Sequence, residues 1–153
     1  MSIQLGALIC HGRDGTTKTF WYEWERDDIH PDRIIVFHVH KSNPPKMNEE
    51  NWFEMTLELC GERLWKITHI GDAERRPHFA AAGIPDALIP EASRVLAAAI
   101  RSSSNRGAKR ENEFRTIDAD KMWKRLLRKG LARYVAGEDY YVCDGATAEQ
   151  AVE

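Results

Sequence analysis

Two histidines stand two residues apart in the segment RIIVFHVH, a spacing that metal sites use. His38 and His40 end a predicted strand, so both imidazoles point to one face of it. A metal ion needs a third and usually a fourth ligand. His11, His69 and His78 could join the pair only through the fold, and no H-x-x-x-H or C-x-x-C motif supports them. We therefore predict no metal site and interpret the pair as polar residues at a strand end.

A second feature with chemical meaning is the charge asymmetry between the two ends of the chain. Between Arg101 and Tyr134 there are 11 Lys or Arg against 4 Asp or Glu, whereas residues 1–60 have 6 against 10. One face of a predicted helix presents Lys121, Lys124, Arg125, Arg128 and Lys129. A basic helix followed by a hairpin is typical of winged-helix DNA-binding domains. A solvated helix face explains the same pattern. This feature supports the alternative function, a non-catalytic domain that binds nucleic acid or an acidic protein through this helix and hairpin.

Composition excludes several classes of protein. The 153 residues include 22 basic and 24 acidic side chains, for a net charge of −2, which excludes a wholly basic nucleic-acid coat. No apolar stretch approaches the roughly 20 residues needed to cross a bilayer. The start, MSIQLGALICHGRDG, has no basic region before its apolar run, unlike a signal peptide. The three cysteines have no zinc-site spacing. We expect a cytoplasmic protein with reduced thiols and no membrane contact.

The elements that must position these residues change in character along the chain. The first half predicts strands at residues 3–10, 17–25, 33–40, 52–60 and 63–70. TKTFWYEWE alternates between aromatic and charged residues, as a strand with one solvent-exposed face does. RIIVFHVH is continuously apolar before its histidines, which indicates a central strand. Gly61 and Glu62 form the turn of a predicted hairpin.

The second half changes to helical spacing. Residues 75–104 are rich in alanine and contain Pro85 and Pro90, which predict either a turn followed by a helix from Pro90 or one kinked helix. A strand would end at residues 101–104. Residues 117–131 predict a helix with Asp118 as N-cap and Gly130 as stop, before a closing hairpin. We predict one α+β domain over residues 1–143, with a mainly antiparallel mixed sheet of five to seven strands and two main helices, and a disordered tail at 144–153.

This order of elements resembles that of the GNAT superfamily of acyl-CoA N-acyltransferases over about residues 52–143. In that family a strand enters a loop of the form Gln/Arg-x-x-Gly-x-Gly/Ala that opens a helix and holds the pyrophosphate of coenzyme A. Aligned on Gly83, the first position falls on Ala80 and the last on Pro85. The resemblance implies a cofactor-binding loop made of Arg75, Arg76, Ala81, Ala82, Gly83 and Ile84.

The chain departs from the family pattern at two positions. Pro85 has no N–H to donate to a phosphate. The family's Asn-x-x-Ala-x-x-x-Tyr motif corresponds to Ala119-x-x-x-Trp123 before Gly130, and an indole is a donor but a very weak acid. In the family that tyrosine often protonates the departing thiolate. Tyr134, with Tyr140 or Tyr141 as alternatives in the terminal hairpin, could replace it; edge-strand packing also explains these tyrosines.

The resemblance implies direct transfer, in which an amine attacks a thioester while a general base removes its proton. His69, Glu54 and Glu58 are the candidate bases, although a half-buried strand histidine and a solvent-facing glutamate pair explain the same residues. The expected function is an acyl-CoA-dependent N-acyltransferase, or a diverged GNAT-like protein that keeps the fold, using acetyl-CoA or another acyl-CoA. The acceptor would be an amine of a small molecule or of a protein. A splayed pair of parallel strands, near 63–70 and 100–103, would form the cofactor cleft.

Overall fold

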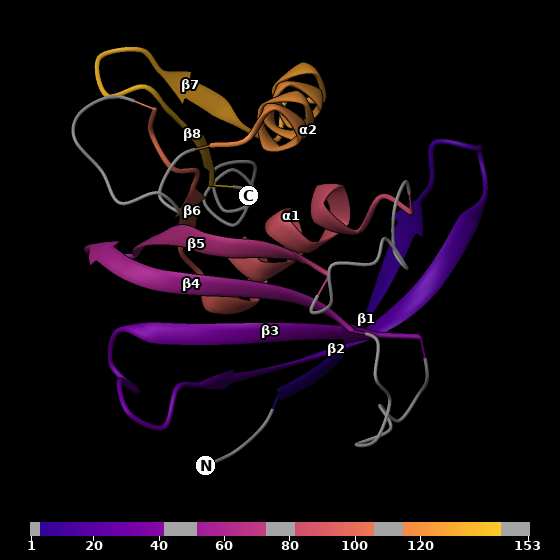
Figure 1. Ribbon diagram of the computed structural model, residues 1–153, viewed down its shortest axis with the longest axis horizontal. Coiled ribbons are helices and arrows are strands. Elements are labelled where there is room, and N and C mark those ends of the chain that lie inside the picture. The colour runs from indigo at the N-terminus through magenta and orange to yellow at the C-terminus, as the bar shows by residue number, and fades with distance from the viewer. Residues whose placement is uncertain (1–3, 42–51, 73–81, 106–114, 145–153) are drawn as a thin grey trace, which may run out of the picture.

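The computed structural model describes residues 4–41, 52–72, 82–105 and 115–144 (Figure 1). These residues form one eight-stranded sheet and two helices, which confirms the predicted α+β class and the mainly antiparallel mixed sheet. The strands are β1 (Gln4–His11), β2 (Thr17–Arg26), β3 (Ile34–His40), β4 (Phe53–Gly61), β5 (Leu64–Asp72), β6 (Ala99–Arg101), β7 (Arg133–Val135) and β8 (Tyr140–Cys143). The helices are α1 (Ile84–Leu96) and α2 (Ile117–Arg128). The prediction of five to seven strands was too low, because β6 and β7 are short strands that still pair within the sheet.

The strand order is β1-β2-β3-β4-β5-β6-β8-β7. The first five strands form the predicted antiparallel meander, and β3 lies at its centre between β2 and β4. Side chains alternate between the two faces, so Ile35, Phe37 and Val39 of β3 are fully buried while Ile34, Val36 and His38 between them are only partly covered. The buried face of the sheet is therefore one continuous apolar surface.

Helix α1 packs against that surface. It contacts β1 at one end of the sheet and β6 and β8 near the other, so the sheet must curve around it (Figure 1). Pro90 lies inside the helix, which corrects the alternative of a helix starting at Pro90. A proline removes one backbone hydrogen bond. The helix continues because Leu88, Ile89 and Ala92 on either side are fully buried in the core.

Helix α2 begins at Ile117, as predicted, but its N-cap differs from the predicted one. Its N-cap is Thr116, whose hydroxyl oxygen accepts a hydrogen bond from the N–H of Ala119 at 3.1 Å, and not Asp118. Asp118 instead lies in the first turn, where its charge favours the helix dipole. The helix ends at Arg128, three residues before the predicted end, and Gly130 follows with φ +75°. Met122, Trp123 and Leu126 form its buried face.

Strand β6 ends within the predicted range 101–104 but lies slightly earlier than the strand expected near residues 100–103. It ends at Arg101, and the N–H of Ser102 then donates to the carbonyl of Tyr141 in β8 at 2.9 Å. The predicted tail lies outside the described residues except for Asp144. Among the helices described, none has the length and apolar character needed to cross a membrane.

Candidate functional site

The sheet opens between β5 and β6. These two strands are parallel and pair in register at only three positions, residues 64–66 with residues 99–101. Beyond Arg101 the chain turns toward β8, and the two strands diverge. The hydroxyl of Ser103 still reaches across the gap to the carbonyl of Ile67 at 3.4 Å. The opening is therefore a wedge whose narrow end is the short parallel pair.

A cavity of about 320 Å³ fills this wedge. One wall is the edge of β5, the second is the pair of serines after β6, and the third is the start of α2. The lining residues are Ile67, Thr68, His69, Ile70, Ser102, Ser103, Arg115, Thr116, Ala119 and Trp123. This volume suits part of a small-molecule ligand, and the mixture of apolar walls with a few polar groups is typical of ligand sites.

A bulge in β5 decides which way His69 points. The β4–β5 register passes from Leu57 opposite Ile67 to Thr56 opposite His69, so Thr68 is an extra residue. Without it, His69 would share a face with the buried Ile67, because strand side chains alternate. The extra residue shifts His69 to the opposite face, beside the side chains of β4 that point away from α1. No helical or strand periodicity in the sequence signals this shift.

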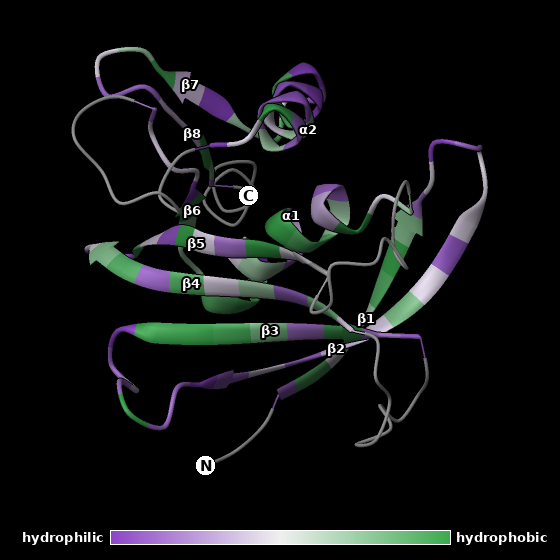
Figure 2. Ribbon diagram, viewed as in Figure 1, coloured by the Kyte–Doolittle hydropathy of each residue, from purple (hydrophilic) through white to green (hydrophobic). Residues whose placement is uncertain are grey.

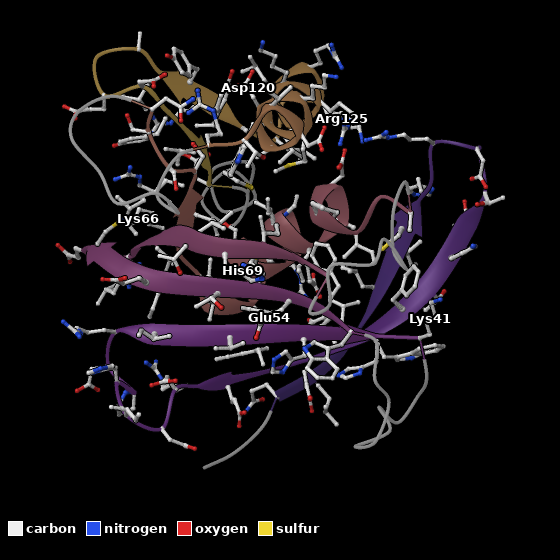
Figure 3. The ribbon with its side chains drawn as sticks, in the orientation of Figure 1. Lys41, Glu54, Lys66, His69, Asp120 and Arg125 are labelled. Carbon is white, nitrogen blue, oxygen red and sulfur yellow. The ribbon has the colours of Figure 1, made fainter. Side chains whose placement is uncertain are left out.

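On that face His69 meets Glu54, another of the candidate bases. Its Nε2 lies 3.6 Å from Oε2 of Glu54, and the other carboxylate oxygen of Glu54 lies 3.2 Å from Nε2 of His38 (Figure 3). His69 is half exposed while Glu54 is about 30% exposed. The carboxylate of Glu54 thus lies between two imidazoles, one on β3 and one on β5, and His69 is among the residues that line the cavity.

The chain of charged and polar groups extends further across the sheet. Oε1 of Glu23 lies 3.8 Å from Nδ1 of His38 and 3.4 Å from Nε2 of the buried His40. The H-x-H pair therefore shares carboxylate partners, as its strand spacing allows. Within the described residues, no three or more His, Cys, Asp or Glu side chains are arranged to hold a metal ion.

The other predicted catalytic residues lie elsewhere. Glu58 stands opposite Ile34 and Lys66, nearer the β4–β5 turn than Glu54 is, and it does not line the cavity. Tyr134 is 41% exposed, and its hydroxyl donates to Oδ1 of Asp139 at 2.6 Å. It too is not a lining residue. The structure therefore brings together His69 and Glu54 but not Glu58 or Tyr134.

Of the predicted cofactor loop, Arg75, Arg76 and Ala81 lie outside the described residues. Ala82 and Gly83 lead into α1, and Ile84 is its buried first residue. Gly83 has φ +81°, and a Cβ there would lie 2.2 Å from the carbonyl oxygen of His11, so only glycine fits.

Pro85 is the second helical residue, and Asp86 follows it in the first turn. The N-terminal end of α1 favours anions through the helix dipole. The carboxylate of Asp86 already places one negative charge there.

The basic residues of α2 are divided between two roles. Arg125 forms two hydrogen bonds with the carboxylate of Asp86, at 2.8 and 2.9 Å, which ties α2 to the start of α1. Lys124 pairs with Asp120 at 3.0 Å. Lys121, Arg128 and Lys129 are exposed. The predicted basic surface therefore includes two side chains whose charges are already compensated within the fold.

Arg115 was not among the predicted site residues. It lines the cavity although its side chain is only 7% exposed. Its guanidinium donates to Asp120 at 2.9 Å, to the carbonyls of Ser103 and Asp139 at 2.9 and 3.2 Å, and to the carboxylate of Asp139 at 3.4 Å. A lone arginine after a polar segment gives no sequence signal of such a role, because all of its acceptors are brought to it by the fold.

Three neighbouring groups favour the ionised form of Asp139. The hydrogen bond from Tyr134, the N–H of Asn105 and the positive charge of Arg115 lower the pKa of Asp139 to about 2. Because Arg115 is surrounded by carboxylates and carbonyls, it supports the wall of the cavity and its charge is already balanced.

Comparisons with protein-family models, with curated proteins and with solved structures found no match to this chain.

Proposed function

We propose that the protein is an acyl-CoA-dependent N-acyltransferase acting on an amine acceptor, or a diverged relative that keeps the fold. One observation carries the proposal: the parallel strands β5 and β6 diverge, and the cavity between them is lined by His69, which is paired with Glu54. A splayed parallel pair at this point is what the resemblance to the GNAT superfamily implies for the cofactor cleft. The order of meander, helix, parallel strand, helix and hairpin agrees with that resemblance.

In the proposed reaction, the acceptor amine attacks the carbonyl carbon of the acyl thioester. A C–N bond forms, the C–S bond breaks, and the products are an amide and free coenzyme A. His69 accepts the proton that the amine loses, and the departing thiolate takes up a proton to become the thiol. Glu54 acts as a positioning residue, since its carboxylate fixes the orientation of the imidazole.

The acid that protonates the thiolate is not the residue implied by the family pattern. Trp123 is 1% exposed, and its ring is stacked on Tyr141 with centroids 5.9 Å apart. No lining residue among those described carries a phenol or a carboxylic acid. The proton on His69 is therefore the nearest source, which returns the histidine to its starting state within each reaction cycle.

The fit of coenzyme A to the start of α1 is supported only in part. Gly83 allows a close approach of the backbone, and the helix dipole favours a phosphate. Pro85 removes one donor and Asp86 adds a negative charge. We expect the lost hydrogen bond, about 1.5–3 kcal/mol to a charged group, to weaken coenzyme A binding by roughly one to two orders of magnitude.

Calorimetry and a thermal shift with acetyl-CoA test the proposal. A ligand at 100 times its dissociation constant adds about 2.7 kcal/mol of stability. His69→Gln should leave acetyl-CoA binding unchanged and lower kcat by roughly 10²–10⁴-fold. His30→Gln, in the exposed β2–β3 turn, is the matched control and should keep full activity. The absence of a shift at millimolar acetyl-CoA would contradict the transferase activity and leave a diverged protein that keeps the fold.

The helix start has a test of its own. Pro85→Gly should strengthen acetyl-CoA binding because it restores an N–H donor, and Arg76→Ala should weaken it because it removes a positive charge from the predicted loop. If calorimetry shows neither change, the segment is a helix entry and the transferase proposal should be dropped.

A further inference from the structure

The two edges of the sheet differ in how well they are protected. At one edge lies β7, which has three residues and begins with Arg133. At the other lies β1, which has eight residues, QLGALICH, without Lys, Arg, Asp, Glu or Pro. Its pairing with β2 runs without a bulge from Gln4 to His11. Charges, prolines, bulges and short length are the usual protections of an edge strand, and β1 has none of them.

The hydrogen bonds of β1 show which backbone groups point outward. The N–H of Gly12 donates to the carbonyl of Thr16 at 2.8 Å, so this pair is hydrogen-bonded. Such pairs alternate along an antiparallel ladder. The N–H and C=O groups of Leu5, Ala7 and Ile9 therefore point away from β2, along the outer edge of the sheet.

The side chains of the same residues are exposed. Leu5 is 66% exposed and Ile9 is 61% exposed, on the face opposite the buried Leu8 and Cys10. Leucine and isoleucine at these positions contribute nothing to the core. An uncharged strand whose outer backbone groups pair with none of the described residues, and whose apolar side chains are exposed, is a template for another strand.

We propose that β1 pairs antiparallel with β1 of a second copy of this chain, around a two-fold axis at Ala7. In this register Ala7 faces itself and Leu5 faces Ile9 of the second copy, which gives two apolar cross-strand pairs and about six backbone hydrogen bonds. The strand carries no charged side chain, so two copies meet without repulsion. The start of α1 selects this register over one that uses His11, because Gly83 already lies against the carbonyl of His11.

The test measures the mass of the full chain by sedimentation between about 1 and 100 µM. A single strand pair is smaller than a standard interface, so a dissociation constant in the micromolar range is expected, roughly 10 µM. Ile9→Lys should weaken the dimer at least tenfold, because it places two charges at the interface. Ile29→Lys is the matched control: Ile29 is 80% exposed in the β2–β3 turn, and its replacement should leave the dimer unchanged.

A disulfide tests the register. In a Cys60→Ser background, which removes the exposed native thiol, Ala7→Cys should form a covalent dimer across the axis. Leu5→Cys in the same background should not, because its partner is Ile9. A monomer at 100 µM would overturn the proposal and leave the edge for an extended segment of another protein. A dimer that Ile9→Lys leaves intact, or cross-linking by Leu5→Cys but not Ala7→Cys, would also overturn it.

Discussion

The region formed by β1–β5 and α1 is held together differently from the region formed by β6–β8 and α2. In the first, long strands pair along most of their length and bury aromatic and aliphatic side chains. In the second, the strands pair at two or three positions, and the guanidinium of Arg115 joins three separate segments. Figure 2 shows β3 hydrophobic along most of its length and α2 largely hydrophilic on the side facing the viewer.

This difference explains where the cavity lies. Apolar packing is non-directional, so it favours contact along the whole surface that two elements share. A few directional hydrogen bonds can instead hold two elements in place and leave a space between them. The cavity lies where the regions meet, between β5 of the first and β6 and α2 of the second. The Arg125–Asp86 pair and the short parallel pair of β5 and β6 join the two regions. The site is thus bounded by one wall held by strand pairing and apolar packing and one wall held by polar contacts.

Phe37→Ala should have the largest effect on stability. Phe37 is fully buried at the centre of β3, with its ring 5.9 Å from that of Tyr22 and 5.7 Å from that of Trp24. Removing a buried phenyl ring costs about 3–5 kcal/mol of unfolding free energy. Urea denaturation measures the change, and Ile29→Ala in the exposed turn should cost less than about 0.5 kcal/mol. A loss below about 1 kcal/mol for Phe37→Ala would show that apolar packing does not dominate this region.

Arg115→Met should have the next largest effect, in the region of β6–β8 and α2. The substitution leaves Asp120 and Asp139 without the cation that they share. We expect the free energy of unfolding to fall by about 2–4 kcal/mol, somewhat less than when a fully buried ion pair is broken. Arg133→Met is the matched control, since Arg133 is 63% exposed and pairs with Asp144 at 3.5 Å, and it should cost less than about 1 kcal/mol.

Hydrogen exchange shows in which region Arg115→Met lowers stability. Arg115→Met should speed exchange in α2, β7 and β8 more than in β2–β4. Uniform acceleration would indicate that the two regions unfold as one unit, contrary to the comparison drawn above.

The sequence predicts the elements of both regions well, including the start of α2 and the closing hairpin β7–β8, but it predicts the contacts of the second, polar region (β6–β8 and α2) poorly. Alternation in TKTFWYEWE and the apolar run in RIIVFHVH place strands within one residue of β2 and β3, because local patterning determines both elements. Strand β6 stops at Arg101, before the end of the strand expected near residues 100–103, because Ser102 turns toward a partner in β8 that lies far along the chain.

The candidate site shows the same limit. His69 and Glu54 were found because titratable side chains stand out in a strand. Their contact was not predictable, because it depends on the bulge at Thr68. Arg115 was missed because its role exists only once residues 102–105 and 139 have been brought beside it.

The smallest predicted change in stability concerns the response of the polar region (β6–β8 and α2) to acid. The pKa of Asp139 is about 2, mainly because of the hydrogen bond from Tyr134, whereas an unfolded aspartate has a pKa near 3.9. A lowered pKa in the folded state stabilises the protein above about pH 4, and that stability is lost as the pH falls through 4 toward 2. Asp139→Asn should therefore cost about 2 kcal/mol at pH 7 and progressively less at lower pH, until it costs almost nothing near pH 2.

Tyr134→Phe separates this structural role from the predicted catalytic one. The substitution removes the hydroxyl that donates to Asp139, so the pKa of Asp139, measured by NMR of its carboxyl carbon, should rise from about 2 toward its usual value. Because Tyr134 does not line the cavity, the same variant should keep its acyl transfer rate if the proposed function holds. An unchanged pKa would show that the hydroxyl does not hold the carboxylate. A large loss of activity with normal stability would instead return Tyr134 to the catalytic machinery, with the hairpin closing over the site.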